Sequence, residues 1–84
     1  MGTKGRIRLD DIFEMLKKCA PGHEIQQGPH HYRVKWKGLI YATLPKGEHG
    51  KREGRAEIEV GQVRHLVRFL SIQDCAQQAL AILR

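Results

Sequence analysis

Two adjacent histidines are the side chains of this sequence best suited to chemistry. His30 and His31 follow the turn signal Gly28-Pro29. Histidine titrates near neutral pH, so an imidazole can take a proton from a hydroxyl, such as a ribose 2′-OH, or give one to a leaving oxygen. The alternative interpretation is that both are ordinary surface histidines at the start of a strand, without a catalytic role. The residues alone leave both interpretations open.

The segment that follows, 31–37, alternates between apolar and basic side chains. Its apolar face consists of Tyr32, Val34 and Trp36. Its other face consists of His31, Arg33, Lys35 and Lys37. A period of two predicts a strand with one buried face. Side chains about 6.6 Å apart on the second face roughly match the phosphate spacing of nucleic acid. A solvated strand face is the alternative.

The charge of the whole chain points to a polyanionic partner. Lys and Arg number 15 against 9 Asp and Glu, which gives a formal net charge of +6 over 84 residues. Such an excess favours nucleic acid or an acidic protein. The predicted contacts are Arg33, Lys35, Lys37, Lys46, Arg64 and Arg68.

Metal and cofactor chemistry has no support in the residue spacing. His49 and His65 fall in no ligand pattern, and Cys19 and Cys75 form no CxxC pair, so we expect neither a metal nor a cofactor. Two buried thiols in a reducing cytoplasm are the simpler interpretation of the cysteines, and a single disulfide is the alternative.

The sequence also carries no membrane or export signal. No apolar run approaches the roughly 18 residues of a membrane span, and the N-terminal stretch MGTKGRIRLDD has no hydrophobic signal core. We therefore expect a cytoplasmic protein without a membrane association.

The elements that must position these residues fit one domain, 1–84. Residues 1–8 are expected to be a loose basic arm. A helix over 10–20 starts with Asp10 as its N-cap and buries Ile12, Phe13, Leu16 and Cys19. A weakly signalled strand at 23–27 precedes the strand of the basic row, and Lys37-Gly38 turns the chain into a return strand over 39–44.

The second half is predicted to be mainly helical. The Gly-rich stretch 46–55 is expected to be a mobile loop. Segment 56–60 alternates like a strand, yet it is also read as extended chain that approaches a helix. That helix buries Val63, Leu66, Val67 and Leu70. Ser71 and Asp74 match a capping box for a C-terminal helical extension, 73–84, with an apolar stripe of Cys75, Ala79, Ile82 and Leu83.

Four stretches in order resemble the HicA family of toxin ribonucleases, over about residues 8–72. Gly28-Pro29-His30 resembles the Gly-Ser-His motif that opens a strand in that family, with proline in place of serine. Gly22-His23-Glu24-Ile25 resembles its first strand after the first helix. Leu44-Pro45 resembles the end of its third strand, and 57–66 resembles the entry into its last core helix.

The resemblance implies a fold like a double-stranded RNA-binding domain: αβββα, a small three-stranded antiparallel sheet with helices on one face. It implies a metal-independent endoribonuclease that cleaves mRNA and is neutralised by a HicB-like antitoxin protein. The glycine register of the motif assigns catalysis to His30, whereas strand alternation puts His31 on the basic face, so both are candidates. The resemblance favours the helix approach at 56–60.

Two other classes of function remain open. A relative without nuclease activity would hold RNA through its shape and phosphates. A protein-interaction module would pack its C-terminal helix on a partner or on a second copy in a homodimer. Closure of the monomer core by that helix is the simplest explanation of its apolar stripe.

Overall fold

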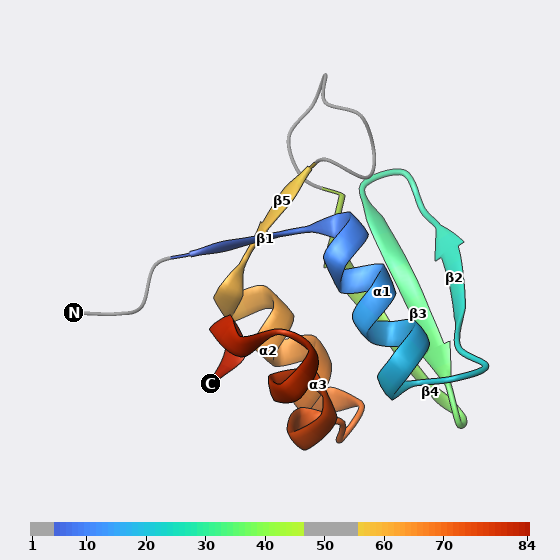
Figure 1. The fold of residues 1–84 in the computed structure, drawn as a ribbon. Helices are drawn as coiled ribbons and strands as arrows, with labels where there is room; N and C mark the ends of the chain where they lie inside the picture. Colours follow the sequence, from blue (N-terminus) through green and yellow to red (C-terminus); the bar gives the residue numbers. More distant parts are fainter. Residues whose placement is uncertain (1–4, 47–55) are drawn as a thin grey trace.

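The computed structural model describes residues 5–46 and 56–84. Its elements in chain order are β1 (Arg6–Arg8), α1 (Leu9–Cys19), β2 (Glu24–Gln27), β3 (His31–Trp36), β4 (Leu39–Pro45), β5 (Glu57–Glu59), α2 (Val60–Phe69), α3 (Gln73–Ala79) and a 3₁₀ turn, Ala81–Leu83. The predicted α+β fold class is confirmed, because helices pack on a three-stranded antiparallel sheet in the order αβββα with an extra C-terminal helix (Figure 1).

The main sheet has the order β2-β3-β4, so the basic strand β3 lies at its centre. Both pairings are antiparallel. The hairpin between β3 and β4 turns at Lys37 (φ 49°) and Gly38 (φ 80°). Two successive left-handed residues match the right-handed twist of the flanking strands. The Lys37-Gly38 turn predicted from the sequence is therefore confirmed.

The pairing of β3 with β4 contains a bulge. Tyr32 lies opposite Leu44, whereas Val34 lies opposite Tyr41. Two residues of β4, 42 and 43, therefore lie opposite the single residue 33 of β3. A bulge of this kind bends the strand and lets both extra side chains point to one side.

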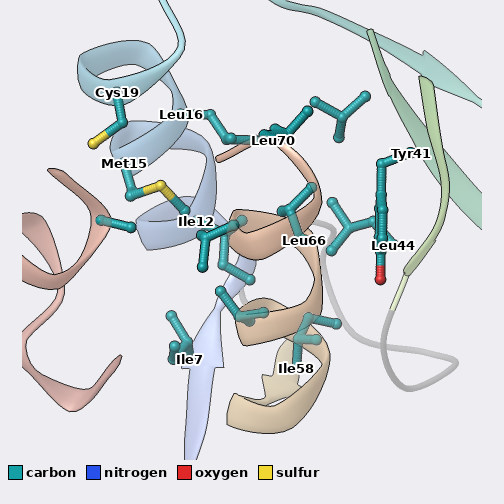
Figure 2. Close-up of a cluster of buried hydrophobic side chains, with 14 of the residues drawn as sticks. Ile7, Ile12, Met15, Leu16, Cys19, Tyr41, Leu44, Ile58, Leu66 and Leu70 are labelled. Atoms are coloured by element: carbon teal, nitrogen blue, oxygen red, sulfur yellow. The ribbon is translucent and has the colours of Figure 1, made fainter. Parts of the chain in front are cut away.

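The core lies between the sheet and the two long helices. Figure 2 shows Tyr41 and Leu44 of β4 facing Leu66 of α2, with Ile12 and Leu16 of α1 beside them. The predicted stripe of α2 is fully buried and consists of Val63, Leu66, Val67 and Leu70. The predicted stripe of α1 is buried except for Phe13, which is partly exposed. Apolar periodicity thus located both helices correctly.

Residues 6–8 form a strand where the sequence indicated an arm. β1 pairs with β5 in a separate two-stranded ribbon (Figure 1). Ile7 and Ile58 face each other and are buried, while the flanking positions pair Arg6 with Glu59 and Arg8 with Glu57. Segment 56–60 is therefore a short strand outside the main sheet that leads directly into α2. The alternation seen in its sequence reflects this ribbon.

The predicted helix caps are wrong, because backbone groups take their place. Asp10 lies inside the first turn of α1, which begins at Leu9. The Leu9 N–H donates to the Ala56 carbonyl at 2.9 Å, and the Val60 N–H donates to the Gly5 carbonyl at 3.0 Å. The residues that directly precede the two strands of the ribbon thus satisfy an early amide of each helix. At α3 the N-cap position is Ile72, without a side-chain cap.

The two cysteines form a disulfide, so the interpretation as two free thiols is wrong. Cys19, at the end of α1, is bonded to Cys75 of α3, with their Cα atoms 5.6 Å apart. Figure 2 shows the Cys19 sulfur directed away from the sheet. Cys75 is itself exposed, and Ala76 is the fully buried residue of α3. Of the predicted C-terminal stripe, Leu83 is buried and Ile82 is 40% exposed.

Within the described part of the chain, no helix has the length and apolar character needed to cross a membrane.

Candidate nucleic-acid interface

The candidate interface is the face of the main sheet that the helices leave uncovered. On β3, Tyr32 and Val34 are buried against the helices, while His31 and Arg33 are exposed and Lys35 is partly exposed. Successive strand residues point to opposite faces. His31, Arg33 and Lys35 therefore form a row along the central strand of the uncovered face, which we name the basic row.

Small and neutral side chains surround the middle of the basic row. Arg33 lies opposite Gln26 of β2 and opposite the bulge residues Ala42 and Thr43 of β4. Both bulge residues are exposed. Short side chains on one flank and an uncharged amide on the other leave the guanidinium accessible to an anion from solvent.

A tight turn between β2 and β3 presents the two histidines. The Gly28 N–H donates to the His31 carbonyl at 2.8 Å. A Cβ atom on residue 28 would lie 2.9 Å from that same oxygen, so the close approach requires glycine. Pro29 and His30 form the exposed bend, and His31 is the first residue of β3. His31 therefore lies in the basic row, whereas His30 lies at the tip of the turn.

Lys37 and Lys46 lie at opposite ends of the sheet. Lys37 is in the β3–β4 turn, with its Nζ 4.5 Å from the centre of the Trp36 ring. Lys46 follows Pro45, the residue opposite His31, and its Nζ lies 5.3 Å from the centre of the Tyr32 ring. Lys46 thus lies at the histidine end of the sheet, but its ammonium contacts a ring on the face that packs against the helices.

Arg64 and Arg68 are not brought together with the basic row. Both belong to α2, which packs on the opposite side of the sheet (Figure 1). The Arg64 guanidinium donates to the Arg84 carbonyl at 3.3 Å. Phe69 contacts the Tyr41 ring and so marks the flank of α2 that faces β4, whereas the helical period places Arg64 on the other flank and Arg68 facing outward.

The histidines of the described segments differ in their surroundings. His30, His31 and His65 are exposed, whereas His23 is partly buried and its Nδ1 lies 2.9 Å from the Ala20 carbonyl oxygen. Within residues 5–46 and 56–84, no three His, Cys, Asp or Glu side chains gather into a potential metal site. His49 and residues 47–55, which make up all but the first residue of the predicted mobile loop 46–55, lie outside the described residues.

A groove of about 670 Å³ opens on the helical side of the sheet. Its lining includes the apolar side chains Phe13 and Ile25 and the acidic side chains Asp10 and Glu14 of α1. Glu14 pairs with Lys17 at 3.1 Å. Lys17 and His23 also line the groove, so its wall has no excess of positive charge and matches a polyanion less well than the basic row does.

A smaller hollow of about 280 Å³ lies at the end of β3 farthest from the histidines. Trp36 and Lys37 line it together with Lys35. The sequence predicted Trp36 on the apolar core face; the side chain does pack against the core, and it is only partly buried. The sequence did contain a signal for this partial exposure, because Trp36 is the last residue before the turn. The end of a strand is covered less completely by packed helices than its middle.

Comparisons with models of known protein families, with curated proteins and with solved structures give no significant match for this chain.

Proposed function

We propose that the chain is an RNA-binding endoribonuclease that cleaves mRNA, acting as the toxin of a toxin–antitoxin pair, as its resemblance to HicA toxins implies. The observation that carries the proposal is the basic row on the central strand of an uncovered sheet face, with a histidine at its first position. A net charge of +6 adds long-range attraction for RNA.

The proposed reaction needs only proton transfer and charge stabilisation. The ribose 2′-oxygen bonds to the adjacent phosphorus as the bond from phosphorus to the 5′-oxygen breaks. A histidine takes the proton of the 2′-OH, and a proton is delivered to the leaving 5′-oxygen. Arg33 is the cation next along the row and would stabilise the developing charge on the phosphoryl oxygens. No metal or cofactor enters these steps.

His31 is the better supported of the two catalytic candidates. It shares a face with Arg33, which is two residues along the same strand, at a spacing of about 6.6 Å. His30, at the tip of the turn, has the glycine register of the HicA motif in its favour and could serve as the second proton carrier. Lys46 follows the strand end opposite His31 and, with its ammonium on the helical side against Tyr32, adds long-range positive charge.

Two partners follow from the proposal. The substrate is mRNA, so the proposed site of action is the cytoplasm. Reductants there would have access to the exposed Cys75 and so to its disulfide with Cys19. The second partner is a HicB-like antitoxin protein that would cover the basic row. An acidic surface on this antitoxin would complement that row.

A nuclease-inactive RNA-binding module is the second candidate. Among residues 5–46 and 56–84, no group holds the ring of His30 or His31 through a side-chain hydrogen bond. Pro29 also lacks the hydroxyl and the N–H of the serine in the HicA motif. Such a module would bind RNA and leave it intact.

The experiment that separates these candidates is RNA cleavage by purified protein in the presence of a chelator. We expect the wild type to cleave single-stranded RNA and to leave 2′,3′-cyclic phosphate ends, with His31→Ala at least about 100-fold slower because loss of one acid–base group removes 10²–10⁴-fold. His65→Ala, an exposed histidine on α2, is the matched control and should cleave normally. Intact RNA with wild-type protein, together with undiminished binding, would leave only the inactive module.

A further inference from the structure

The hollow at the end of β3 combines an aromatic ring, apolar side chains and cations. It is lined by Trp36, Lys35, Lys37, Leu39, Ile40 and Glu24, among others. Its volume of about 280 Å³ is just below the range of roughly 300–1,000 Å³ typical of pockets for drug-sized ligands. The hollow therefore suits a single planar ring system.

The Trp36 ring is held in place by the chain itself. Its Nε1–H donates to the Pro21 carbonyl at 3.0 Å, which links the end of β3 to the loop after α1. Because this donor is already satisfied and part of the side chain packs against the core, what the indole still offers a ligand is the exposed part of its ring surface. The Lys37 ammonium lies 4.5 Å from the ring centre and occupies part of that surface.

The rim of the hollow exposes more apolar surface than the rest of the sheet. Leu39 is 38% exposed and Ile40 is 52% exposed, and they are two of the four large exposed apolar side chains in the described segments. Ile40 lies opposite Lys35, so an apolar and a cationic side chain stand next to each other. A ligand with a flat apolar part and an anionic part would satisfy both.

We propose that this hollow binds one unpaired nucleotide of the RNA strand, with its base against Trp36 and its phosphate between Lys35 and Lys37. The inference rests on the proposed RNA-binding function and extends it to a second point of contact. On base entry Lys37 turns from the ring to the phosphate, because stacking of a base on an aromatic ring is worth more than an exposed cation–π contact.

The hollow is placed so that one strand of RNA can touch both points. His31 and Trp36 are the first and last residues of β3, which puts them about 17 Å apart at about 3.3 Å per residue. Arg33 and Lys35 lie between them. Alternation puts Trp36 on the opposite face from Arg33 and Lys35, so RNA that runs along the basic row passes around the end of β3 to reach the ring. Lys35 and Lys37 line the same hollow and mark that passage.

One acidic side chain belongs to the lining and must be included in the charge balance. Glu24 of β2 lies opposite Lys35. Its carboxylate offsets one of the two lysines, so the hollow keeps a net positive charge. Because stacking tolerates any base, we expect little sequence preference at this point.

Trp36 is the single tryptophan of the chain, so its fluorescence reports on this hollow alone. We expect short single-stranded RNA to quench Trp36 emission, with the same midpoint as the rise in anisotropy of a labelled copy of that RNA. His31→Ala protein keeps the RNA intact during titration. Anisotropy that rises while Trp36 emission stays constant would overturn the inference and leave the proposed RNA binding standing.

Matched variants separate a local role from a folding defect. Ile40→Glu puts a negative charge at the rim on an exposed side chain, and we expect about ten-fold weaker RNA binding. Ile82→Glu makes the same change at a position that is 40% exposed and away from the hollow, and should bind like wild type. Equal affinity of these two variants contradicts the inference. No RNA binding by wild type at low salt refutes the proposed function itself.

Discussion

Gly28 determines where the histidines lie, and its role is steric. Its N–H donates to the His31 carbonyl, and the missing side chain allows the two backbones to approach. The residue therefore fixes both the start of β3 and the end of the basic row. Its φ angle is not left-handed, so close approach is the reason for glycine at this position.

Replacement of Gly28 by alanine should destabilise the hairpin. A Cβ atom 2.9 Å from the His31 oxygen forces backbone atoms apart, and we expect a loss of about 1–3 kcal/mol in the free energy of unfolding, as for other overpacked sites. Chemical denaturation followed by far-UV circular dichroism measures it. Gly61→Ala is the control, because its Cβ meets nothing within 4 Å on α2 and should leave stability equal or raise it by up to about 1 kcal/mol. Equal stability of both variants would contradict the steric role.

The sequence predicted correctly which residues of α2 are buried, because packing determines burial. It failed for the helix caps, because backbone contacts from distant residues determine them. The buried stripe of α2 follows from its periodicity, because the core has one place for such a stripe. Asp10 and Ser71 have the right chemistry for caps. The residues that directly precede the strands of the β1–β5 ribbon nevertheless supply carbonyls to α1 and α2, and Ser71 takes a left-handed backbone with φ 59°. No local sequence pattern indicates a carbonyl acceptor that lies about 50 residues away in the chain.

At the scale of elements, α3 is the part that the sequence alone could not place. Its seven residues bury one side chain fully, Ala76. So small an apolar face contributes little by itself. The disulfide between Cys19 and Cys75 fastens α3 to the end of α1, and the two cysteines are separated by 56 residues. The sequence offers this disulfide only as an alternative, because the distance between two cysteines 56 residues apart is known only once both helices are in place.

Removal of the disulfide should lower stability considerably. A closed loop of 56 residues restricts the unfolded chain by about 4 kcal/mol in the loop-entropy treatment. We expect Cys19→Ala/Cys75→Ala to lose that order of free energy of unfolding, and a thiol reductant to destabilise the wild type to the same extent. The reductant should have no effect on the double variant, which is the control. An equal denaturation midpoint of the wild type with and without reductant would contradict a stabilising role of the disulfide.

For the strands, the sequence pattern predicted their positions in the chain but not every detail of their pairing. Alternation located β3, because one of its faces is buried against the helices, whereas the Lys37-Gly38 turn and Pro45 located the return strand β4. The bulge opposite Arg33 was not predicted, since residues 42 and 43 are small side chains that either register could accept. That bulge nevertheless exposes the centre of the basic row. β5 alternates equally well, yet it joins a different sheet, which depends on β1 and not on its own sequence.

At the scale of the whole molecule, positive charge is divided between two sides. The basic row lies on the uncovered side of the sheet, whereas Arg64 and Arg68 lie on α2 behind it. This division cannot be predicted from the net charge or from the positions of basic residues in the sequence, because it depends on which side of the sheet the helices cover. Long-range attraction draws on all these charges, while direct phosphate contact draws on one side only.

The salt dependence of RNA binding reports which side makes the contact. Each phosphate contact on a single strand contributes about 0.7 to the slope of log affinity against log salt. We expect Arg33→Gln and Lys35→Gln each to reduce the slope by about that amount, when anisotropy is measured between about 50 and 200 mM salt. Arg64→Gln and Arg68→Gln remove the same charge from the other side and should keep the wild-type slope. A reduced slope for the α2 variants alone would place RNA across the helices and remove the basic row from the interface.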